Sequence, residues 1–165
     1  MSLANIRKKA GYAYYTCTSG TTGTPKVVMV PHDAMIAMVQ SWKTVFKLDE
    51  NSNTDIHLNM ADMSFDVFLG DCFRAFSSGA TLVLEHKQAL EHPETLYSHI
   101  VDNNVTVAEF VPSVLMRLVE YMEEKKLEYS GFRLLIHGSS PISILECERI
   151  VERFGNETQF VNTYG

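Results

Sequence analysis

Hydrophobic and polar residues alternate along this chain with two different periods. From residue 80 onward, short apolar runs are separated by longer segments in which apolar residues recur every three or four positions. Short apolar runs bounded by turn residues indicate buried strands, whereas the 3.6-residue period indicates amphipathic helices. The pattern therefore predicts strands at 80–84, 105–110, 132–137 and 159–164, and helices at 92–103, 112–125 and 142–154.

The first half of the chain is less regular but follows the same logic. Apolar runs predict strands at 12–18, 27–30 and 55–60. Asp33 is a predicted helix cap, because the apolar residues after it form one helical stripe: Met35, Met38, Val39, Trp42, Val45 and Phe46. A second helix is predicted at 66–76, ending near Gly79 because glycine accepts the left-handed conformation that stops helices.

Strands that alternate with helices predict an α/β fold, a mainly parallel sheet built from βαβ units with helices on its faces. In open sheets of this kind, ligands bind beyond the carboxyl ends of the strands. Those ends carry Glu109, residues 137–139 and residues 162–164. We expect these residues to line one rim of the sheet.

Charge and composition narrow the possible functions. The 165 residues carry a formal net charge of −6, and nucleic acids and anionic membranes both require a basic surface. We therefore expect no nucleic-acid or membrane partner. The three cysteines, Cys17, Cys72 and Cys147, are widely spaced and odd in number, which predicts neither a disulfide framework nor a metal site and favours the reducing cytoplasm.

The two ends of the chain suggest its domain organisation. Residues 1–10 are interpreted as a leader, Met1-Ser2-Leu3, and a short charged entry segment, Ile6-Arg7-Lys8-Lys9. The last predicted strand is followed by no closing helix. Residues 11–165 are therefore interpreted as part of a domain that is truncated at both ends.

The loop "TSGTTGTPK", residues 18–26, is the strongest chemical signal in the first half. Its glycines leave room against bare backbone, while its hydroxyls, its amides and Lys26 suit an anion. The loop lacks the GxxxxGK[ST] order of a Walker A motif. From composition alone, a plain surface turn and a phosphate-binding loop are about equally good interpretations.

Four stretches in order decide between these interpretations: "YYTCTSGTTGTPK", "SFDVFLGDCFRAFSSGATLVL", "LLIHGSSPIS" and "NTYG". Together they closely resemble the adenylation domains of nonribosomal peptide synthetases, and the chain is similar to part of the large N-terminal subdomain of an adenylate-forming enzyme. One position departs from the family pattern, since Val27 stands where that family usually has glycine. This predicts a straighter, strand-like exit from the loop.

The resemblance implies roles for individual residues. The loop would hold the ATP phosphates through Thr18, Ser19, Gly20, Thr21, Thr22, Gly23 and Lys26. The later motifs would border the adenine and AMP site with Gly138, Ser139, Asn162, Thr163 and Tyr164. The amino-acid pocket would be lined by Asp66, Val67, Gly70, Glu109, Leu135 and His137. Thr163 would line this pocket as well.

The roles of the two acidic residues in this set, Asp66 and Glu109, need separate argument. From the residues alone, Asp66 is best interpreted as a helix N-cap, whereas the resemblance implies that its carboxylate pairs with the α-ammonium of an amino acid. A carboxylate such as Glu109 is costly inside an apolar pocket without a cation, and Gly70 is expected to leave space for a long side chain. The opening Asp-Val-Gly-Glu pattern resembles pockets that accept ornithine or a related basic amino acid. Alternatively, Glu109 faces water or hydrogen-bonds His137.

The reaction implied by the resemblance converts an amino acid and ATP to an aminoacyl-adenylate and pyrophosphate. The acyl group would pass to the phosphopantetheine thiol of a peptidyl carrier domain in the same synthetase. The Mg²⁺ ligand and the lysine of the small C-terminal domain are expected beyond Gly165, so no catalytic set is complete here and the chain alone is expected to be inactive.

Three alternatives stay open at this point. An acyl-CoA or aryl-CoA ligase shares the phosphate loop, but a fatty-acid pocket has no ammonium for Asp66 to bind. A D-alanine–carrier ligase binds an amino acid, although its small substrate would need a bulkier residue than Gly70. A non-catalytic nucleotide-binding or carrier-docking module is the third alternative.

Overall fold

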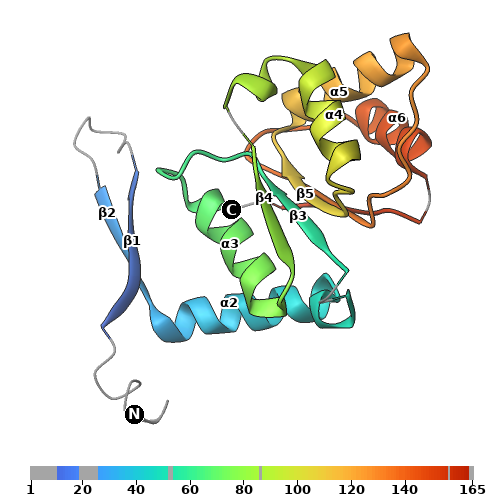
Figure 1. The fold of residues 1–165 in the computed structure, drawn as a ribbon. Helices are drawn as coiled ribbons and strands as arrows, with labels where there is room; N and C mark the ends of the chain where they lie inside the picture. Colours follow the sequence, from blue (N-terminus) through green and yellow to red (C-terminus); the bar gives the residue numbers. More distant parts are fainter. Residues whose placement is uncertain (1–10, 19–25, 52–53, 86, 156, 164–165) are drawn as a thin grey trace.

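A computed structural model of the chain describes residues 11–18, 26–51, 54–85, 87–155 and 157–163. Within these residues, a five-stranded parallel sheet has helices on both faces, and a two-stranded antiparallel hairpin stands beside it (Figure 1). The strands are β1 (Tyr12–Thr18), β2 (Lys26–Pro31), β3 (Ile56–Asn59), β4 (Thr81–Leu84), β5 (Val107–Phe110), β6 (Leu134–His137) and β7 (Gln159–Asn162). The α-helices are α2 (His32–Val45), α3 (Asp66–Ser78), α4 (Pro93–Asp102), α5 (Pro112–Lys125) and α6 (Ile144–Phe154), with 3-10 turns η1 (Leu48–Asn51) and η2 (Lys87–Leu90).

The order of the strands creates a point where the winding of the chain reverses. The order is β4-β3-β5-β6-β7, so the chain moves outward from β3 to β4 and then returns past β3 to β5. Since the direction of winding changes there, α2 and α3 lie on one face of the sheet, while α4, α5 and α6 lie on the other (Figure 1). Crevices at such reversals, beyond the carboxyl ends of the strands, are the usual ligand sites of open α/β sheets.

Side-chain alternation along the strands builds two apolar layers. On the α4–α6 face, Leu58, Ala108 and Leu135 pack against helix residues such as Leu115 and Ile150. The layer on the α2 side is smaller and contains, with Trp42 against it, Phe46, Leu48, Val107, Leu134 and Ile136. Each fully buried aliphatic side chain contributes roughly 1.5–3 kcal/mol, so the larger layer dominates the stability of the sheet.

The predicted α/β fold and the predicted parallel sheet are confirmed, and so is the order of the elements. The apolar stripe of α5 is also confirmed: Leu115, Leu118, Val119 and Met122 are buried and Val114 is half-buried. Most ends shift by one or two residues, as for α3, which runs on to Ser78 and ends at Gly79 with a left-handed φ of 76°. The two 3-10 turns were not predicted.

Two predictions about helix starts are wrong. Asp33 does not cap α2: the helix begins at His32 after Pro31, whose fixed φ already suits a helix start, and Asp33 lies in the first turn. Helix α6 begins at Ile144, not at residue 142, because Ser143 and Glu146 form a reciprocal capping box there. In addition, Val45 is exposed and does not belong to the apolar stripe of α2. Trp42 is the last helix residue that contacts the smaller apolar layer, and Phe46, just after the helix, is buried in that layer.

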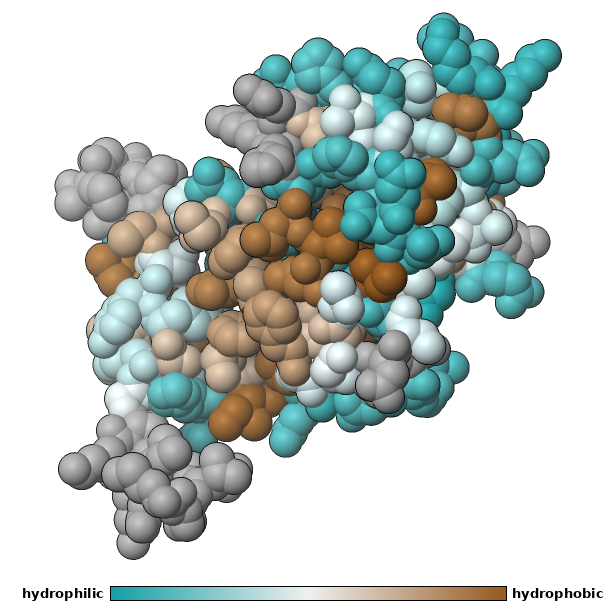
Figure 2. All heavy atoms as spheres, in the orientation of Figure 1, coloured by the Kyte–Doolittle hydropathy of each residue, from teal (hydrophilic) through white to brown (hydrophobic). Residues whose placement is uncertain are grey.

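The surface of the molecule includes exposed apolar side chains. Such side chains gather in the middle of the face that Figure 2 shows. Phe76 and Leu84 are among the large apolar residues that are exposed. Among the described residues, none of the helices combines the length and apolarity needed to cross a bilayer.

Candidate active site

A cavity of about 900 Å³ lies at the carboxyl ends of β3 and β5, where the winding of the sheet reverses. The segment after β3 and the first turn of α3 form one wall, and the ends of β4 and β5 and the turn after β6 form the others. Of the predicted site residues, the lining includes Asp66, Val67, Glu109, Gly138 and Ser139. The expectation that the strand ends gather at one rim is confirmed for the described residues.

Asp66 begins α3 at the mouth of this cavity. The N-cap position belongs to Phe65, and the α3 N-terminus has no side-chain cap, so the N-cap interpretation of Asp66 is wrong. The carboxylate is solvent-exposed and lines the cavity. The pKa of Tyr14, on the hairpin, is raised by burial and then by the negative charge of Asp66. An anionic group thus faces the cavity and is available to a cation.

Glu109 is the second acidic residue on the wall, and it has a partner that sequence reasoning missed. Its Oε2 atom accepts a hydrogen bond from the guanidinium of Arg74, whose side chain is only 4% exposed. Arg74 also donates to Asp71 Oδ1 at 2.6 Å, and Asn59 Nδ2 donates to Asp71 Oδ2 at 2.8 Å. Glu109 therefore neither faces water freely nor bonds His137, and both alternatives are corrected.

Gly70 does not open into empty space. A Cβ atom added there would lie 3.5 Å from Arg74 Nη1 and 3.5 Å from the Trp42 ring. The guanidinium carbon of Arg74 lies 4.8 Å from the centroid of the Trp42 ring, a cation–π contact. The space that Gly70 was expected to leave for a substrate is filled by the chain's own arginine.

Leu135 and His137 lie away from the cavity lining. In the parallel register Glu109 pairs with Ile136 and Phe110 pairs with His137, so Leu135 and His137 point to the opposite face from Glu109. Leu135 belongs to the larger apolar layer, and the His137 ring stacks on Phe160 with centroids 4.8 Å apart. Burial lowers the pKa of His137. Strand alternation separates these two residues from the wall that carries Glu109.

The turn after β6 is held tightly against the end of β7. Thr163 donates from its amide and from Oγ1 to the His137 carbonyl, at 2.8 and 3.1 Å. A Cβ atom on Gly138 would lie 2.6 Å from Thr163 Oγ1, and Ser139 adopts a left-handed φ of 67°. Asn162 ends β7 and is exposed, while Tyr164 lies outside the described residues.

The predicted phosphate loop is largely outside the described residues, namely Ser19, Gly20, Thr21, Thr22 and Gly23. Its two ends are described: Thr18 and Lys26 face each other as the last pair of the β1–β2 hairpin. Val27 lies inside β2, which confirms the predicted strand-like exit.

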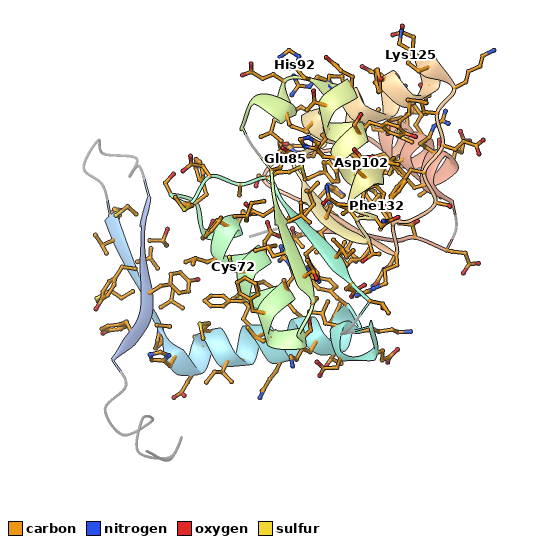
Figure 3. The ribbon with its side chains drawn as sticks, in the orientation of Figure 1. Cys72, Glu85, His92, Asp102, Lys125 and Phe132 are labelled. Carbon is orange, nitrogen blue, oxygen red and sulfur yellow. The ribbon has the colours of Figure 1, made fainter. Side chains whose placement is uncertain are left out.

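The missed residues carried a weak signal. Asp71 and Arg74 are oppositely charged and three positions apart in a helix that is otherwise largely apolar, a spacing that indicates a pair on one helix face. Glu85, labelled in Figure 3, lines the cavity from the end of β4. Its Oε2 atom lies 2.6 Å from Nδ1 of His99 on α4. Asn59 and Glu109, in contrast, lie on the neighbouring strands β3 and β5, and only the sheet brings these two strands together.

The sequence profile of the AMP-binding enzyme family matches residues 4–165. The chain belongs to this family. It is 35% identical to gramicidin S synthase 2 of Brevibacillus brevis over 164 residues, which are 99% of this chain and 4% of that protein. The chain thus spans about 4% of the length of this curated relative.

Two solved structures share the fold. The nonribosomal peptide synthetase FmoA3 in an AMPPNP-bound form has a TM-score of 0.80 at 24% identity, covering 93% of this chain and 16% of that one. The Vibrio cholerae adenylation domain AlmE, in complex with glycyl-adenosine-5'-phosphate, has a TM-score of 0.74 at 25% identity, covering 93% of this chain and 28% of that one. The predicted similarity to nonribosomal peptide synthetases is confirmed.

Proposed function

We propose that this chain is part of an adenylation domain, which activates an amino acid with ATP and loads it onto a peptidyl carrier domain of the same synthetase. The observation that carries the proposal is the Asp66 carboxylate in a chain of the AMP-binding enzyme family. This carboxylate does not cap helix α3 and is exposed at the mouth of the cavity. An α-ammonium bound at Asp66 would lie in the cavity beyond the carboxyl ends of the strands.

The proposed step joins a substrate carboxylate to the α-phosphate of ATP. A carboxylate oxygen attacks the α-phosphorus, a P–O bond forms, and the bond to the β-phosphate bridge breaks to release pyrophosphate. The protein's contribution is to position the reactants and balance charge. We assign the β- and γ-phosphates to the loop of residues 18–26, and the adenylate to Gly138, Ser139, Asn162, Thr163 and Tyr164.

The Mg²⁺ ligand is expected beyond Gly165, and the phosphopantetheine thiol belongs to the carrier domain. We therefore expect no amino-acid-dependent ATP–pyrophosphate exchange by the 165 residues alone. We propose that a longer protein carries these residues, and activity should be measured in that protein.

We further propose that the side-chain pocket selects ornithine or another basic amino acid. Glu109 is not an uncompensated carboxylate, because Arg74 supplies a cation. A charge count supports the proposal: Asp71 and Glu109 provide two carboxylates to one guanidinium, so an ionised cluster keeps one negative charge. A single substrate ammonium at Glu109 would neutralise it.

ATP–pyrophosphate exchange over a panel of amino acids tests both proposals in the longer protein. We expect exchange with ornithine or lysine and its loss in Asp66→Asn, which keeps the shape of the side chain but removes its charge. A carboxylic acid without an α-amino group should not replace the amino acid. Exchange that is indifferent to Asp66→Asn would refute the ammonium role, and a preference for acidic or aliphatic side chains would refute the basic pocket.

A further inference from the structure

Arg74 lies between two carboxylates at the back of the cavity wall. It reaches Asp71 on its own helix and Glu109 on β5, and its side chain is 4% exposed. Glu109 is 14% exposed and lines the cavity, so it is the member of this group that a substrate can touch. Arg74 is outside the cavity lining and can act on a substrate through Glu109.

Arg74 is itself held by residues from three elements. Asp71 is one helical turn before it on α3, and Asn59 at the end of β3 fixes the other oxygen of Asp71. The Trp42 ring of α2 packs against the guanidinium. A charged group restrained on several sides keeps its partner in one orientation, which is what a binding site requires of its polar side chains.

We propose that Arg74 is a positioning residue that holds the Glu109 carboxylate in one orientation at the cavity wall, and that it thereby sustains the preference for a cationic substrate side chain. This inference rests on the proposed role of Glu109 in the pocket. It adds a specificity determinant that touches neither the substrate nor ATP.

The charges around Glu109 explain why Arg74 matters. Asp71 and Arg74 face it from α3, Asp66 and Glu85 line the same cavity, and His57 on β3 is near Arg74. His57 is neutral at physiological pH because burial lowers its pKa to about 4. Without Arg74, the Asp71 and Glu109 carboxylates have no cation between them among these groups, and Glu109 loses the ion pair that fixes its orientation.

The test compares ornithine with norvaline, which has the same carbon chain without the ammonium, in exchange assays of the longer protein. We expect Arg74→Met to lower the ornithine-to-norvaline ratio of kcat/KM about tenfold, because the charge-assisted contact at Glu109 is lost. The loss should lie mainly in KM.

Four further variants separate this role from a structural one. Arg74→Lys keeps the charge and should restore most of the ratio. Glu109→Gln should remove the preference for ornithine over norvaline. Adding Arg74→Met to Glu109→Gln should lower the ratio of kcat/KM no further. The matched control is Arg133→Met, which breaks an arginine–carboxylate pair with Asp55 at the amino ends of the strands and should leave the ratio unchanged.

The outcomes distinguish the two proposals. If the unmodified protein does not prefer ornithine or lysine, the basic pocket and the role of Arg74 both fail. Suppose that the unmodified protein prefers ornithine, but Arg74→Met leaves the ornithine-to-norvaline ratio unchanged or lowers it equally with and without Glu109. Arg74 is then a structural residue, and the pocket proposal stands. A fall of the same size in Arg133→Met would assign the effect to stability.

Discussion

Gly138 is the position where the structure leaves least room for change. A methyl group at Cα would lie 2.6 Å from Thr163 Oγ1 and 3.1 Å from the Thr163 carbonyl oxygen. Real Cβ contacts are longer than the first of these distances, so Gly138→Ala must move β7 away from β6. Thr163 cannot yield easily, because its amide and hydroxyl are both bonded to the His137 carbonyl.

We expect Gly138→Ala to lower the free energy of unfolding by about 1–3 kcal/mol, the usual cost of inserting a methyl group into a packed site. The proposed adenylate site is at the same turn, so the KM for ATP should rise as well. Urea unfolding measures the first effect, and exchange at varied ATP measures the second. The control is Gly11→Ala, where no atom lies within 4 Å of the added Cβ.

A second variant identifies the cause. Thr163→Ala removes the hydroxyl that the new methyl group meets, so the two substitutions together should cost less than the sum of their separate effects. Equal stabilities for Gly138→Ala and Gly11→Ala would refute the steric argument. Strict additivity of Gly138→Ala and Thr163→Ala would show that the hydroxyl is not the atom that resists.

Three further predictions concern stability. Asp55→Ala leaves Arg133 without its carboxylate and removes the acceptor of Thr106 Oγ1, so urea unfolding should show a loss of about 2–4 kcal/mol, while a change below about 0.5 kcal/mol would contradict the pairing. Ser143→Ala removes half of the α6 capping box and should cost about 1 kcal/mol, with Ser143→Thr as the control that keeps the cap. His57 is buried with its pKa lowered to about 4, so the unfolded chain binds a proton below about pH 6.5 that the folded chain refuses, and stability falls as the pH drops from about 6.5 to 4. Burial raises the pKa of Asp71 to about 6, which opposes this trend, so the test is the difference between the unmodified protein and His57→Gln. That difference should change by up to about 3 kcal/mol over this range, and a pH-independent difference would refute the assignment.

The prediction of the fold from sequence succeeded where one local pattern was sufficient. The α5 stripe predicted a helix because each apolar residue recurs with the helical period, and packing then buried it. Helix starts were harder, since Asp33 and Ser143 are both acceptable caps by residue type. The structure shows that only Ser143 is a cap. Helix α2 starts after Pro31, so Asp33 lies inside it, whereas Ser143 and Glu146 form a reciprocal capping box at the start of α6.

The candidate site was predicted in part for a related reason. Asp66 and Val67 follow each other on one helical turn. Glu109 and Gly138 lie at the carboxyl ends of the neighbouring strands β5 and β6, so the topology brings them together. Leu135 and His137 were assigned to the pocket by resemblance, but the strand register turns them to the other face. Arg74 was missed because nothing along the chain indicates that a helix residue reaches a carboxylate 35 positions away.

The sequence by itself determined the family, the alternation of strands and helices, and the rim at which polar residues gather, because these depend on local periodicity and on motifs read in order. Only the tertiary structure decided how the acidic residues are used. Asp66 is left free at the mouth of the cavity, whereas Glu109 shares Arg74 with Asp71. Pairing of charges depends on distances between elements far apart in the chain, and packing of α2 and α3 against the sheet sets those distances.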